Sequence, residues 1–284
     1  MNRVSHHGFF CQLNILADHY IGGGIAGRLH EWKGLTQDPE ILNIVQHGLS
    51  LHLGQHPTPT PPIQLKFSQH ETLIIDEEIQ TLLNIKVIVE STIEQNDYFS
   101  PIFIRKNKDE TNRVILNLKK LNANVDTYHF KMESIKNVLN MVTPNSFMAS
   151  VDLKKAFYSI PIQPSHQHFL KFYWNRAYKF LVMPNGYSDA MRVFTKILKP
   201  PFAQLRSEGY LSTVYVDDTF LLGDTAQECM ENVQSTVKLL QKLGFTVHPD
   251  KSVLIPQQTM EFLGYIVDTI RMRLTLTVRK KGQN

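Results

Sequence analysis

Apolar residues follow a helical period in two stretches of the chain. Across residues 71–84 they recur every three or four positions, which predicts an amphipathic helix leading into a short β-branched strand that ends near Val89. Residues 225–244 repeat this pattern, with Thr225 placed to cap the start of the helix and Gly244 to end it. The apolar stripe of the first helix is predicted to consist of Ile75, Ile79, Leu82 and Leu83.

Apolar runs separated by turn residues predict strands between these helices. Residues 100–122 have two such runs around a charged turn, which is typical of a β-hairpin with cations at its tip. A short buried strand ends at Asp152, and residues 212–223 form a tight hairpin around the adjacent Asp217 and Asp218. Because helices and antiparallel hairpins mix along the chain, the predicted class is α+β.

Prolines shape two further predictions. Residues 188–209 have the pattern of a long amphipathic helix that is interrupted at Pro200 and Pro201. Near the start of the chain, a short helix is expected to stop at Pro39, and the proline-rich run at 57–62 is expected to be an extended linker at a domain boundary.

The composition is that of an ordinary globular protein. The chain has 284 residues, of which 42% are hydrophobic and 20% charged, enough for one large or two modest domains. Its two cysteines give no disulfide framework, no basic and apolar leader opens the chain, and no apolar run approaches the roughly 20 residues that cross a bilayer. We therefore expect an intracellular protein, cytoplasmic or nuclear, without a membrane partner.

Positive charge is concentrated in two places. The formal net charge is +4, and five cations and no acid lie in residues 271–284. A second cluster falls in and just after the predicted hairpin, and consists of Arg105, Lys106, Lys108, Arg113, Lys119 and Lys120. Such a cluster either binds an anionic partner or keeps a sheet edge soluble. By contrast, His47, His52 and His56 have no cysteine or carboxylate at ligand spacing, which favours a solvated loop over a metal site.

The acids at strand ends are the strongest chemical signal. Aspartate favours turns, so Asp217 and Asp218 alone have a simple structural explanation. If the strand that ends at Asp152 is their neighbour in one sheet, however, three carboxylates converge and repel unless cations neutralise them. Two divalent ions roughly 3.5–4 Å apart are the arrangement used for in-line phosphoryl displacement.

Six segments, in order over roughly residues 85–267, resemble the fingers and palm of a retroelement reverse transcriptase. They are SPIFIRKNKDETNRVILNLKKLN, SVDLKKAFYSIPI, VMPNGYSDAMRVFTKIL, YVDD, LGFTVHPDKS and EFLGYIV. AGRLHEWKGLTQDPEILNIVQHG and FTKILKP look most like retrotransposons of the DIRS type. The resemblance implies a right-hand polymerase fold, with an antiparallel palm sheet backed by helices. The implied domains are an N-terminal extension with a short helix at 1–60, fingers at 61–145, palm at 146–270 with an inserted fingers segment at about 162–184, and a basic tail or truncated start of a thumb at 271–284.

The resemblance also implies roles for the acids and their neighbours. Asp152 and Asp217 would ligate two Mg²⁺ ions, for which Mn²⁺ can substitute, with Asp218 beside them as a ligand or a support. The carbonyl oxygen of Leu153 would also reach a metal. Phe157 takes the position whose ring underlies the sugar of the incoming nucleotide, so that a ribose 2′-hydroxyl would clash.

Further residues match the nucleotide and primer contacts of this family. Arg113 matches the fingers arginine that closes on the triphosphate, and Asn107 stands where the family's triphosphate lysine is usually found, so that Lys106 or Lys108 would replace it. Asn185 stands at the site of a nucleotide-contacting glutamine in retroviral enzymes. The remaining implied contacts are Gly186 at the nucleotide, Lys251 as a proton donor to pyrophosphate, and a primer grip of Phe262, Leu263, Gly264 and Tyr265.

The expected function is RNA-directed DNA synthesis from a primer on an RNA or DNA template with deoxynucleoside triphosphates. The first alternative is a decayed or domesticated relative that binds nucleic acid without synthesis. The second is an RNA-dependent RNA polymerase, which Phe157 disfavours. The family continues into a helical thumb and often a ribonuclease H domain, whereas this sequence ends in TLTVRKKGQN. We therefore expect weak product binding unless a partner or a further segment supplies those parts.

Overall fold

The computed structural model describes residues 20–106, 112–126 and 128–277, which form two compact units. The basic-hairpin unit comprises Tyr20–His129 and Lys155–Lys196. The carboxylate unit comprises Phe130–Lys154 and the described residues from Ile197 onward. Helix α7 (Ala190–Ser207) begins in the former unit and ends in the latter.

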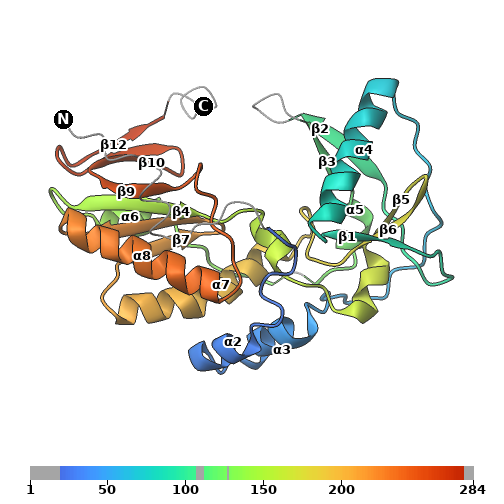
Figure 1. Ribbon diagram of the computed structural model, residues 1–284, viewed down its shortest axis with the longest axis horizontal. Helices are drawn as coiled ribbons and strands as arrows, with labels where there is room; N and C mark the ends of the chain where they lie inside the picture. Colours follow the sequence, from blue (N-terminus) through green and yellow to red (C-terminus); the bar gives the residue numbers. More distant parts are fainter. Residues whose placement is uncertain (1–19, 107–111, 127, 278–284) are drawn as a thin grey trace. The chain divides into compact units, whose positions relative to one another are not determined.

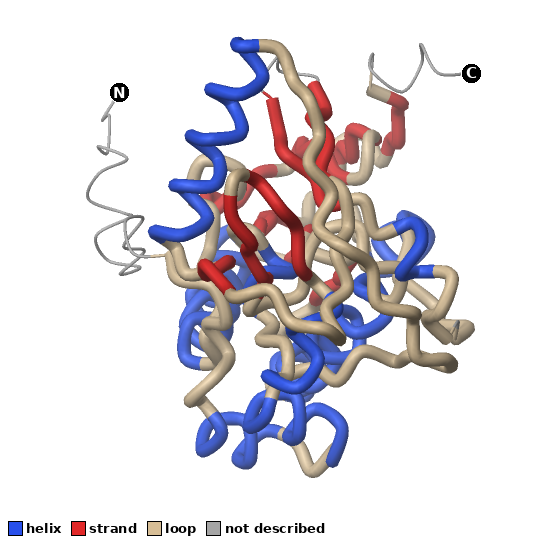
Figure 2. Tube along the Cα trace, turned by 90° about the vertical axis from the view of Figure 1, so that its right-hand side faces the viewer, coloured by secondary structure: helices blue, strands red, loops and turns tan. Residues whose placement is uncertain are grey.

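The basic-hairpin unit contains two antiparallel sheets. Strand β2 (Ile102–Lys106) pairs with β3 (Asn112–Leu116), and β6 (Arg176–Phe180) lies between β1 (Ile88–Ser91) and β5 (Lys171–Trp174). Helix α4 (Gln69–Asn84) starts at a capping box and runs beside the β2–β3 hairpin (Figures 1 and 2). The other helices of this unit are α2 (Leu29–Leu35), α3 (Pro39–His47), α5 (Lys119–Asn122) and the 3₁₀ helices η1 (Ala156–Ser159) and η2 (Pro164–Phe169).

The carboxylate unit is a four-stranded antiparallel sheet with helix α8 (Ala226–Lys242) along one face (Figure 1). Its strand order is β7-β8-β4-β9. A smaller antiparallel sheet has the order β10-β11-β12. The remaining bounds are α6 (Ile135–Met141), β4 (Phe147–Asp152), β7 (Ser212–Tyr215), β8 (Asp218–Gly223), β9 (Val253–Gln257), β10 (Thr259–Phe262), β11 (Tyr265–Asp268) and β12 (Arg273–Leu276).

One hydrophobic core joins the two sheets of the carboxylate unit. Its buried members come from α6 and from strands of both sheets. One of these strands is β8, which begins with Asp218. They are Val138, Met148, Phe220, Leu222, Met260, Phe262 and Val267. Apolar area removed from water stabilises a fold by roughly 25 cal/mol per Å². This core therefore anchors the strands whose ends carry the acids.

The α+β class is confirmed, as are both predicted helices and the antiparallel hairpins. Helix α4 buries the predicted stripe at Ile75, Ile79 and Leu82. Helix α8 has Thr225 as its N-cap in a capping box, and Gly244 follows it with a positive φ of 99°. These helices were predictable because their amphipathic period and their caps agree.

The predicted interruption at Pro200 and Pro201 is wrong, because α7 runs through both prolines. A proline inside a helix removes one backbone hydrogen bond and costs about 3 kcal/mol. Here Ile197, Leu198 and Phe202 are each at most 2% exposed. Burial of these side chains on one face offsets the lost hydrogen bonds, and a propensity rule cannot anticipate that contribution.

The first short helix, α2, ends at Leu35, before Pro39, and Pro39 begins helix α3, which was not predicted. Asp38 caps α3 through hydrogen bonds from the backbone N–H groups of Glu40 and Ile41. Residues 20–62 form part of the basic-hairpin unit, and strand β12 lies inside the segment expected to be a basic tail. The domain boundaries drawn from the sequence stay predictions. No helix in the described residues is long and apolar enough to span a membrane.

Candidate active site

Strands β4 and β8 place Asp152 directly opposite Asp218. Asp217 lies in the two-residue turn between β7 and β8, and its carbonyl oxygen accepts a hydrogen bond from the backbone N–H of Leu153 at 3.4 Å. Directly opposed residues of an antiparallel pair have Cβ atoms about 4.5–5.5 Å apart on one face of the sheet. The strand that ends at Asp152 is thus the neighbour of the Asp217–Asp218 hairpin, as the convergence hypothesis required.

The turn that presents Asp217 has an unusual backbone. Val216, its first central residue, has a φ of 57°, which is the region that glycine normally occupies in tight hairpin turns. A left-handed conformation costs a non-glycine residue roughly 1–2 kcal/mol, and a β-branched side chain is especially rare there. Val216 is 8% exposed, so burial of its side chain helps to hold the strained turn. Such strain is concentrated at functional sites.

The three carboxylates carry more negative charge than their surroundings neutralise. Desolvation, and then repulsion by Asp217, raise the pKa of Asp152 from 3.8 to about 6, although Lys251 opposes the shift. Desolvation and Asp217 also raise the pKa of Asp218, which stands partly at the surface. Like charges at directly opposed strand positions are destabilising unless something pairs with them. The acids therefore form a site that favours a bound cation.

The turn after α8 fixes the backbone of Asp152 from the other side. The N–H of Asp152 donates to Oγ of Ser252 at 3.0 Å, and its carbonyl oxygen accepts from the N–H of His248 at 2.8 Å. Ser252 in turn donates from Oγ to the carbonyl of His248 at 2.8 Å. Sequence reasoning singled out Lys251 in this turn and missed Ser252, although serine beside a proline turn is a residue that bonds backbone groups.

The carboxylate oxygens of this site are donors of the kind that hard divalent cations bind. In the described part of the chain, no three His, Cys, Asp or Glu side chains form a group that could hold a metal ion by themselves. Magnesium is bound in nucleotide-processing sites by one or two carboxylates, with waters and substrate phosphates completing the shell. Burial and the neighbouring Asp217 raise the pKa of Asp152, and a cation beside its carboxylate would oppose that shift.

The raised pKa of Asp152 predicts that the stability of the metal-free protein depends on pH. The folded pKa of Asp152, about 6, lies above its usual 3.8, so the folded state binds more protons than the unfolded state between these values. Protonated Asp152 therefore contributes to the stability of the folded state below pH 3.8, its usual pKa. This contribution is lost as the pH rises through the folded pKa of about 6. Because the side chain is partly exposed, we expect the loss to be on the order of 1 kcal/mol.

Urea denaturation of the wild type and of Asp152→Asn at about pH 5 and about pH 7.5, both in chelator, measures this effect. The wild type should lose more stability than the variant across the interval, and Mg²⁺ at the higher pH should restore it. An equal pH dependence in both proteins would show that Asp152 has an ordinary pKa.

Most of the predicted nucleotide-contacting residues belong to the basic-hairpin unit, whereas Leu153 and Lys251 belong to the carboxylate unit. Phe157 lies in η1, is partly exposed, and packs edge-on against Phe194 with 5.6 Å between ring centroids. Arg113 is exposed on β3. Lys106 ends β2, whereas Asn107 and Lys108 lie outside the described residues.

Tyr158 and Asn122, which sequence reasoning missed, form hydrogen bonds that hold Asn185 and Gly186 in place. Tyr158 is 8% exposed, its hydroxyl is hydrogen-bonded to the side chain of Asn185, and burial raises its pKa to about 12. The amide of Asn122 donates to the carbonyl of Gly186 at 2.8 Å and accepts from the N–H of Ser188 at 3.0 Å. Gly186 has a φ of 92°, so the turn that carries Asn185 requires glycine and is fixed from α5.

The predicted primer grip is a tight turn that follows β10, a strand with alternating exposed and buried residues. Phe262 is 5% exposed and packs on Phe220, so its side chain is part of the core. Leu263 and Gly264 both have positive φ, 49° and 77°, as in the hairpin turns that match strand twist. Thr277 donates from its N–H and from Oγ1 to the carbonyl of Gly264. The surface presented here is therefore the turn, together with Tyr265 at the start of β11.

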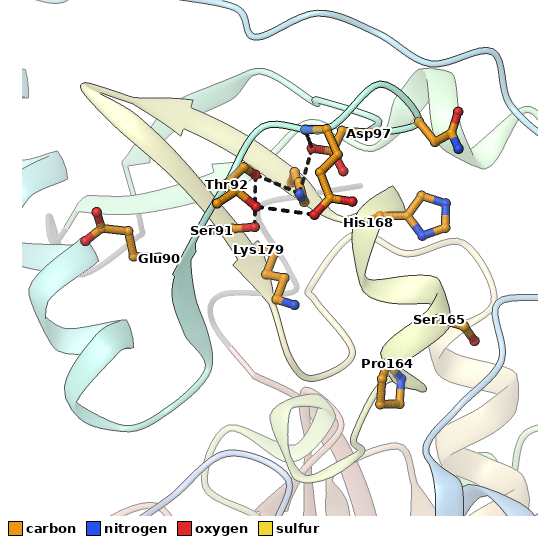
Figure 3. A pocket seen from close by; sticks show the side chains of 11 residues that line it. Glu90, Ser91, Thr92, Asp97, Pro164, Ser165, His168 and Lys179 are labelled. Carbon is orange, nitrogen blue, oxygen red and sulfur yellow. Dashed lines mark hydrogen bonds and ion pairs between the residues drawn. The ribbon is translucent and has the colours of Figure 1, made fainter.

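A polar cavity of about 560 Å³ lies in the basic-hairpin unit (Figure 3). At its wall, Nζ of Lys171 lies 2.6 Å from a carboxylate oxygen of Asp97, and the two side chains are 4% and 2% exposed. The same Nζ donates to the carbonyl of Thr92 at 3.0 Å, and Asp97 accepts from the N–H of Glu94 at 2.7 Å. Sequence reasoning missed this pair, although a lysine inside the apolar run HFLKFYW signals a buried partner.

Comparisons with known proteins identify a family for this chain. A family described as reverse transcriptase (RNA-dependent DNA polymerase) matches residues 104–267. The Gag-Pol polyprotein of woolly monkey sarcoma virus is 27% identical over 212 residues, 71% of this chain and 12% of the polyprotein. The Pro-Pol polyprotein of simian foamy virus type 1 is 24% identical over 233 residues, 82% of this chain and 19% of the polyprotein. The chain thus spans less than a fifth of either viral polyprotein.

Solved structures share the fold. The foamy viral protease-reverse transcriptase dRH in complex with double-stranded DNA superimposes with a TM-score of 0.71 at 22% identity, covering 90% of this chain and 44% of that one. The foamy viral enzyme in complex with an RNA/DNA hybrid gives a TM-score of 0.68 at 21% identity, covering 90% and 33%. Because the family match spans more than half of the sequence and includes all three acids, this chain belongs to the reverse transcriptase family.

Proposed function

We propose that this chain is an RNA-directed DNA polymerase module that adds deoxynucleotides to the 3′-hydroxyl of a primer. One observation carries the proposal: a reverse transcriptase fold in which Asp152 and Asp218 face each other across β4 and β8, with Asp217 on the strained turn beside them. Burial, and then the charge of Asp217, raise the pKa of both Asp152 and Asp218, and clustered carboxylates of this kind suit divalent cations.

Asp152 and Asp217 would hold two divalent ions, with Asp218 and the carbonyl of Leu153 as further oxygen donors. When bound, Mg²⁺ or Mn²⁺ would neutralise the phosphates and lower the pKa of the attacking hydroxyl. Lys251 is exposed, and its charge acts on both Asp152 and Asp218, which supports the proposal that it would donate a proton to the leaving pyrophosphate.

Residues of the basic-hairpin unit would bind the incoming nucleotide. Arg113 has a planar guanidinium group that is always charged and can bond two phosphate oxygens at once. Lys106 or Lys108 would add a second positive charge. Asn185, held by Tyr158, would contact the nucleotide beside Gly186. The turn at Leu263 and Gly264 would hold the primer backbone. Support for a primer and template as partners comes from foamy viral enzymes of the same fold, which were solved with DNA and with an RNA/DNA hybrid.

Phe157 is expected to exclude ribonucleotides by its size. Its ring is partly exposed and packs against Phe194, which limits its movement. A ribose 2′-hydroxyl would therefore clash with the ring. Phe157→Val should raise the use of ribonucleoside triphosphates relative to deoxynucleotides by about 100-fold or more, which corresponds to roughly 3 kcal/mol of steric discrimination. Ratios of kcat/KM for dTTP and UTP measure this. Unchanged sugar discrimination would remove the steric role from Phe157.

Primer extension tests the proposed function. Purified protein is given oligo-dT on poly-rA or on poly-dA with dTTP, in Mg²⁺, in Mn²⁺ or in chelator. The proposal predicts extension on RNA that needs a divalent ion. Salt-sensitive binding of primer–template without any extension would instead identify a nucleic-acid-binding relative that has lost catalysis.

We further propose an origin in a retrotransposon of the DIRS type. The support is sequence resemblance in AGRLHEWKGLTQDPEILNIVQHG and FTKILKP, which form α2, α3 and part of α7. Such elements carry a tyrosine recombinase. A recombinase coding sequence in the same genomic element would support this origin, and an integrase in its place would contradict it.

A further inference from the structure

We infer that Glu133 is a positioning residue for the catalytic hairpin, the β7–β8 pair whose turn carries Asp217. The inference rests on the proposed function and adds to it a residue that acts through the protein backbone. Glu133 comes just before α6 and lies in the carboxylate unit, as Asp217 does. Its side chain holds the outer edge of β7, and through that strand it sets where the turn presents its carboxylate.

Strand β7 lies at the edge of its sheet. In the order β7-β8-β4-β9 it has one strand neighbour, and it is only four residues long. Along an antiparallel pair, residues whose backbone groups bond the partner strand alternate with residues whose groups point away from it. The N–H of Val214 points away from β8, since it bonds a side chain outside the sheet. This edge of the catalytic hairpin is therefore held by side chains.

The carboxylate of Glu133 bonds two successive residues of this edge. Its Oε2 accepts hydrogen bonds from the backbone N–H of Val214 and from Oγ1 of Thr213, both at 2.7 Å. Its Oε1 accepts from the guanidinium of Arg206 at 3.0 Å. Thr213 is 1% exposed, so loss of Glu133 would remove a partner from a buried hydroxyl. Hydrogen bonds to a charged acceptor are roughly twice as strong as neutral ones, so these contacts hold β7 firmly.

The residues that Glu133 holds are close to the strained turn. Val214 lies two positions before Val216, whose φ is 57°, and three positions before Asp217. Such a backbone conformation persists only where the surrounding structure fixes it. Pairing with β8 holds one side of the strand, and Glu133 holds the other. Without Glu133, β7 can shift and carry the Asp217 carboxylate with it, and a misplacement of about 1 Å can cost about a hundredfold in rate.

The division of contacts between the two carboxylate oxygens separates positioning from charge. Both bonds to β7 end on one oxygen, so the amide oxygen of a Glu133→Gln variant can keep them. The variant loses the ion pair with Arg206, in which the side chains are 40% and 32% exposed, and ion pairs this exposed contribute little. A positioning role therefore predicts that glutamine replaces Glu133 and that alanine does not.

A set of matched variants tests the inference. Glu133→Ala removes both bonds to β7, Glu133→Gln keeps them, and Thr213→Val removes one of them while leaving the carboxylate in place. Arg206→Ala breaks only the ion pair with Glu133. Glu208→Ala removes an exposed acid of the same unit that bonds the side chain of Gln204. Asp217→Asn serves as the reference for loss of the acid site.

Three quantities are measured for each protein, at equal concentration of folded chain. They are amide hydrogen exchange across residues 210–218, affinity for Mn²⁺ by electron paramagnetic resonance, and kcat and KM for dTTP. Glu133→Ala should exchange about tenfold faster in this segment, because the edge of β7 loses charge-assisted hydrogen bonds. It should also bind Mn²⁺ more weakly and lose about tenfold to a hundredfold in kcat, with KM for dTTP nearly unchanged.

Thr213→Val should change all three quantities in the same direction as Glu133→Ala but by less, and it decides the question if the alanine variant does not fold. Glu133→Gln, Arg206→Ala and Glu208→Ala should stay within about threefold of the wild type. Unchanged exchange or unchanged kcat in Glu133→Ala would overturn the inference, as would a glutamine variant that is as impaired as the alanine variant.

A wild type that adds no nucleotide would refute the proposed function, and the other two measurements would still decide the role of Glu133. Faster exchange together with weaker Mn²⁺ binding in Glu133→Ala would support positioning of the acids. Faster exchange with unchanged Mn²⁺ binding would show that Glu133 stabilises β7 without positioning Asp217.

Discussion

Asp152→Asn is expected to reduce RNA-templated primer extension by at least about a thousandfold while making the metal-free protein more stable. The carboxylate is lost as a cation ligand, and electrostatic stabilisation of the transition state is usually the largest single contribution to catalysis. At the same time, the variant removes a charge whose pKa is raised to about 6 by desolvation and by Asp217. At neutral pH, a gain on the order of 1 kcal/mol should raise the unfolding midpoint by about 2–4 °C.

The control for this prediction is Asp224→Asn. Asp224 is an exposed acid that follows β8 in the same unit, and its carboxylate lies at a long hydrogen-bond distance of 3.4 Å from the hydroxyl of Thr143. The control variant should retain wild-type extension and stability. Single-turnover extension and thermal unfolding in chelator report the two effects separately. An inactive and destabilised Asp152→Asn protein would point to a structural role for the carboxylate.

Asp97→Ala is expected to destabilise the protein by about 3–5 kcal/mol, the largest stability effect that we predict. Its partner Lys171 is 4% exposed, so removal of Asp97 leaves an ammonium group buried without its counter-charge. The remaining contact of Nζ with the carbonyl of Thr92 cannot neutralise that charge. Urea denaturation at neutral pH measures the loss, and a broken two-state transition would show that the basic-hairpin unit unfolds alone.

Two further variants make this prediction specific. Glu90→Gln disrupts an exposed ion pair with Arg176, in which the side chains are 56% and 60% exposed, and should change stability by less than about 1 kcal/mol. Replacing the buried pair together, as Asp97→Leu with Lys171→Met, should recover most of the loss because no buried charge remains. If Asp97→Ala is as mild as Glu90→Gln, the pair is solvated in solution.

Local signals in the sequence predicted the elements that bear the site. Asp217 and Asp218 between two apolar runs predicted a hairpin, and the apolar strand before Asp152 predicted a third acid at a strand end. The order of the motifs predicted the fold, because the resemblance extends over 85–267 and the family match over 104–267. Turn chemistry and apolar period are local properties, so one sequence is enough to read them.

Properties that depend on register and burial could not be predicted in this way. Only the strand pairing shows that Asp152 faces Asp218 and that Arg105 faces Arg113. The buried partner of Lys171 lies 74 positions away in sequence, and no pattern links the two residues. Helix α7 passes through Pro200 because apolar side chains on both sides of it are buried, and burial is a tertiary property.

In the proposed mechanism, synthesis depends on metal ions held by the three carboxylates. The test measures addition of one dTMP to an oligo-dT primer annealed to poly-rA, with Mg²⁺ and with excess chelator. Wild type and Asp217→Asn are compared at equal concentration of folded protein. We expect incorporation by the wild type with Mg²⁺, none in chelator, and none by the variant in either condition. Incorporation that persists in Asp217→Asn, or that proceeds in chelator, would show that synthesis does not depend on metal ions held by these acids.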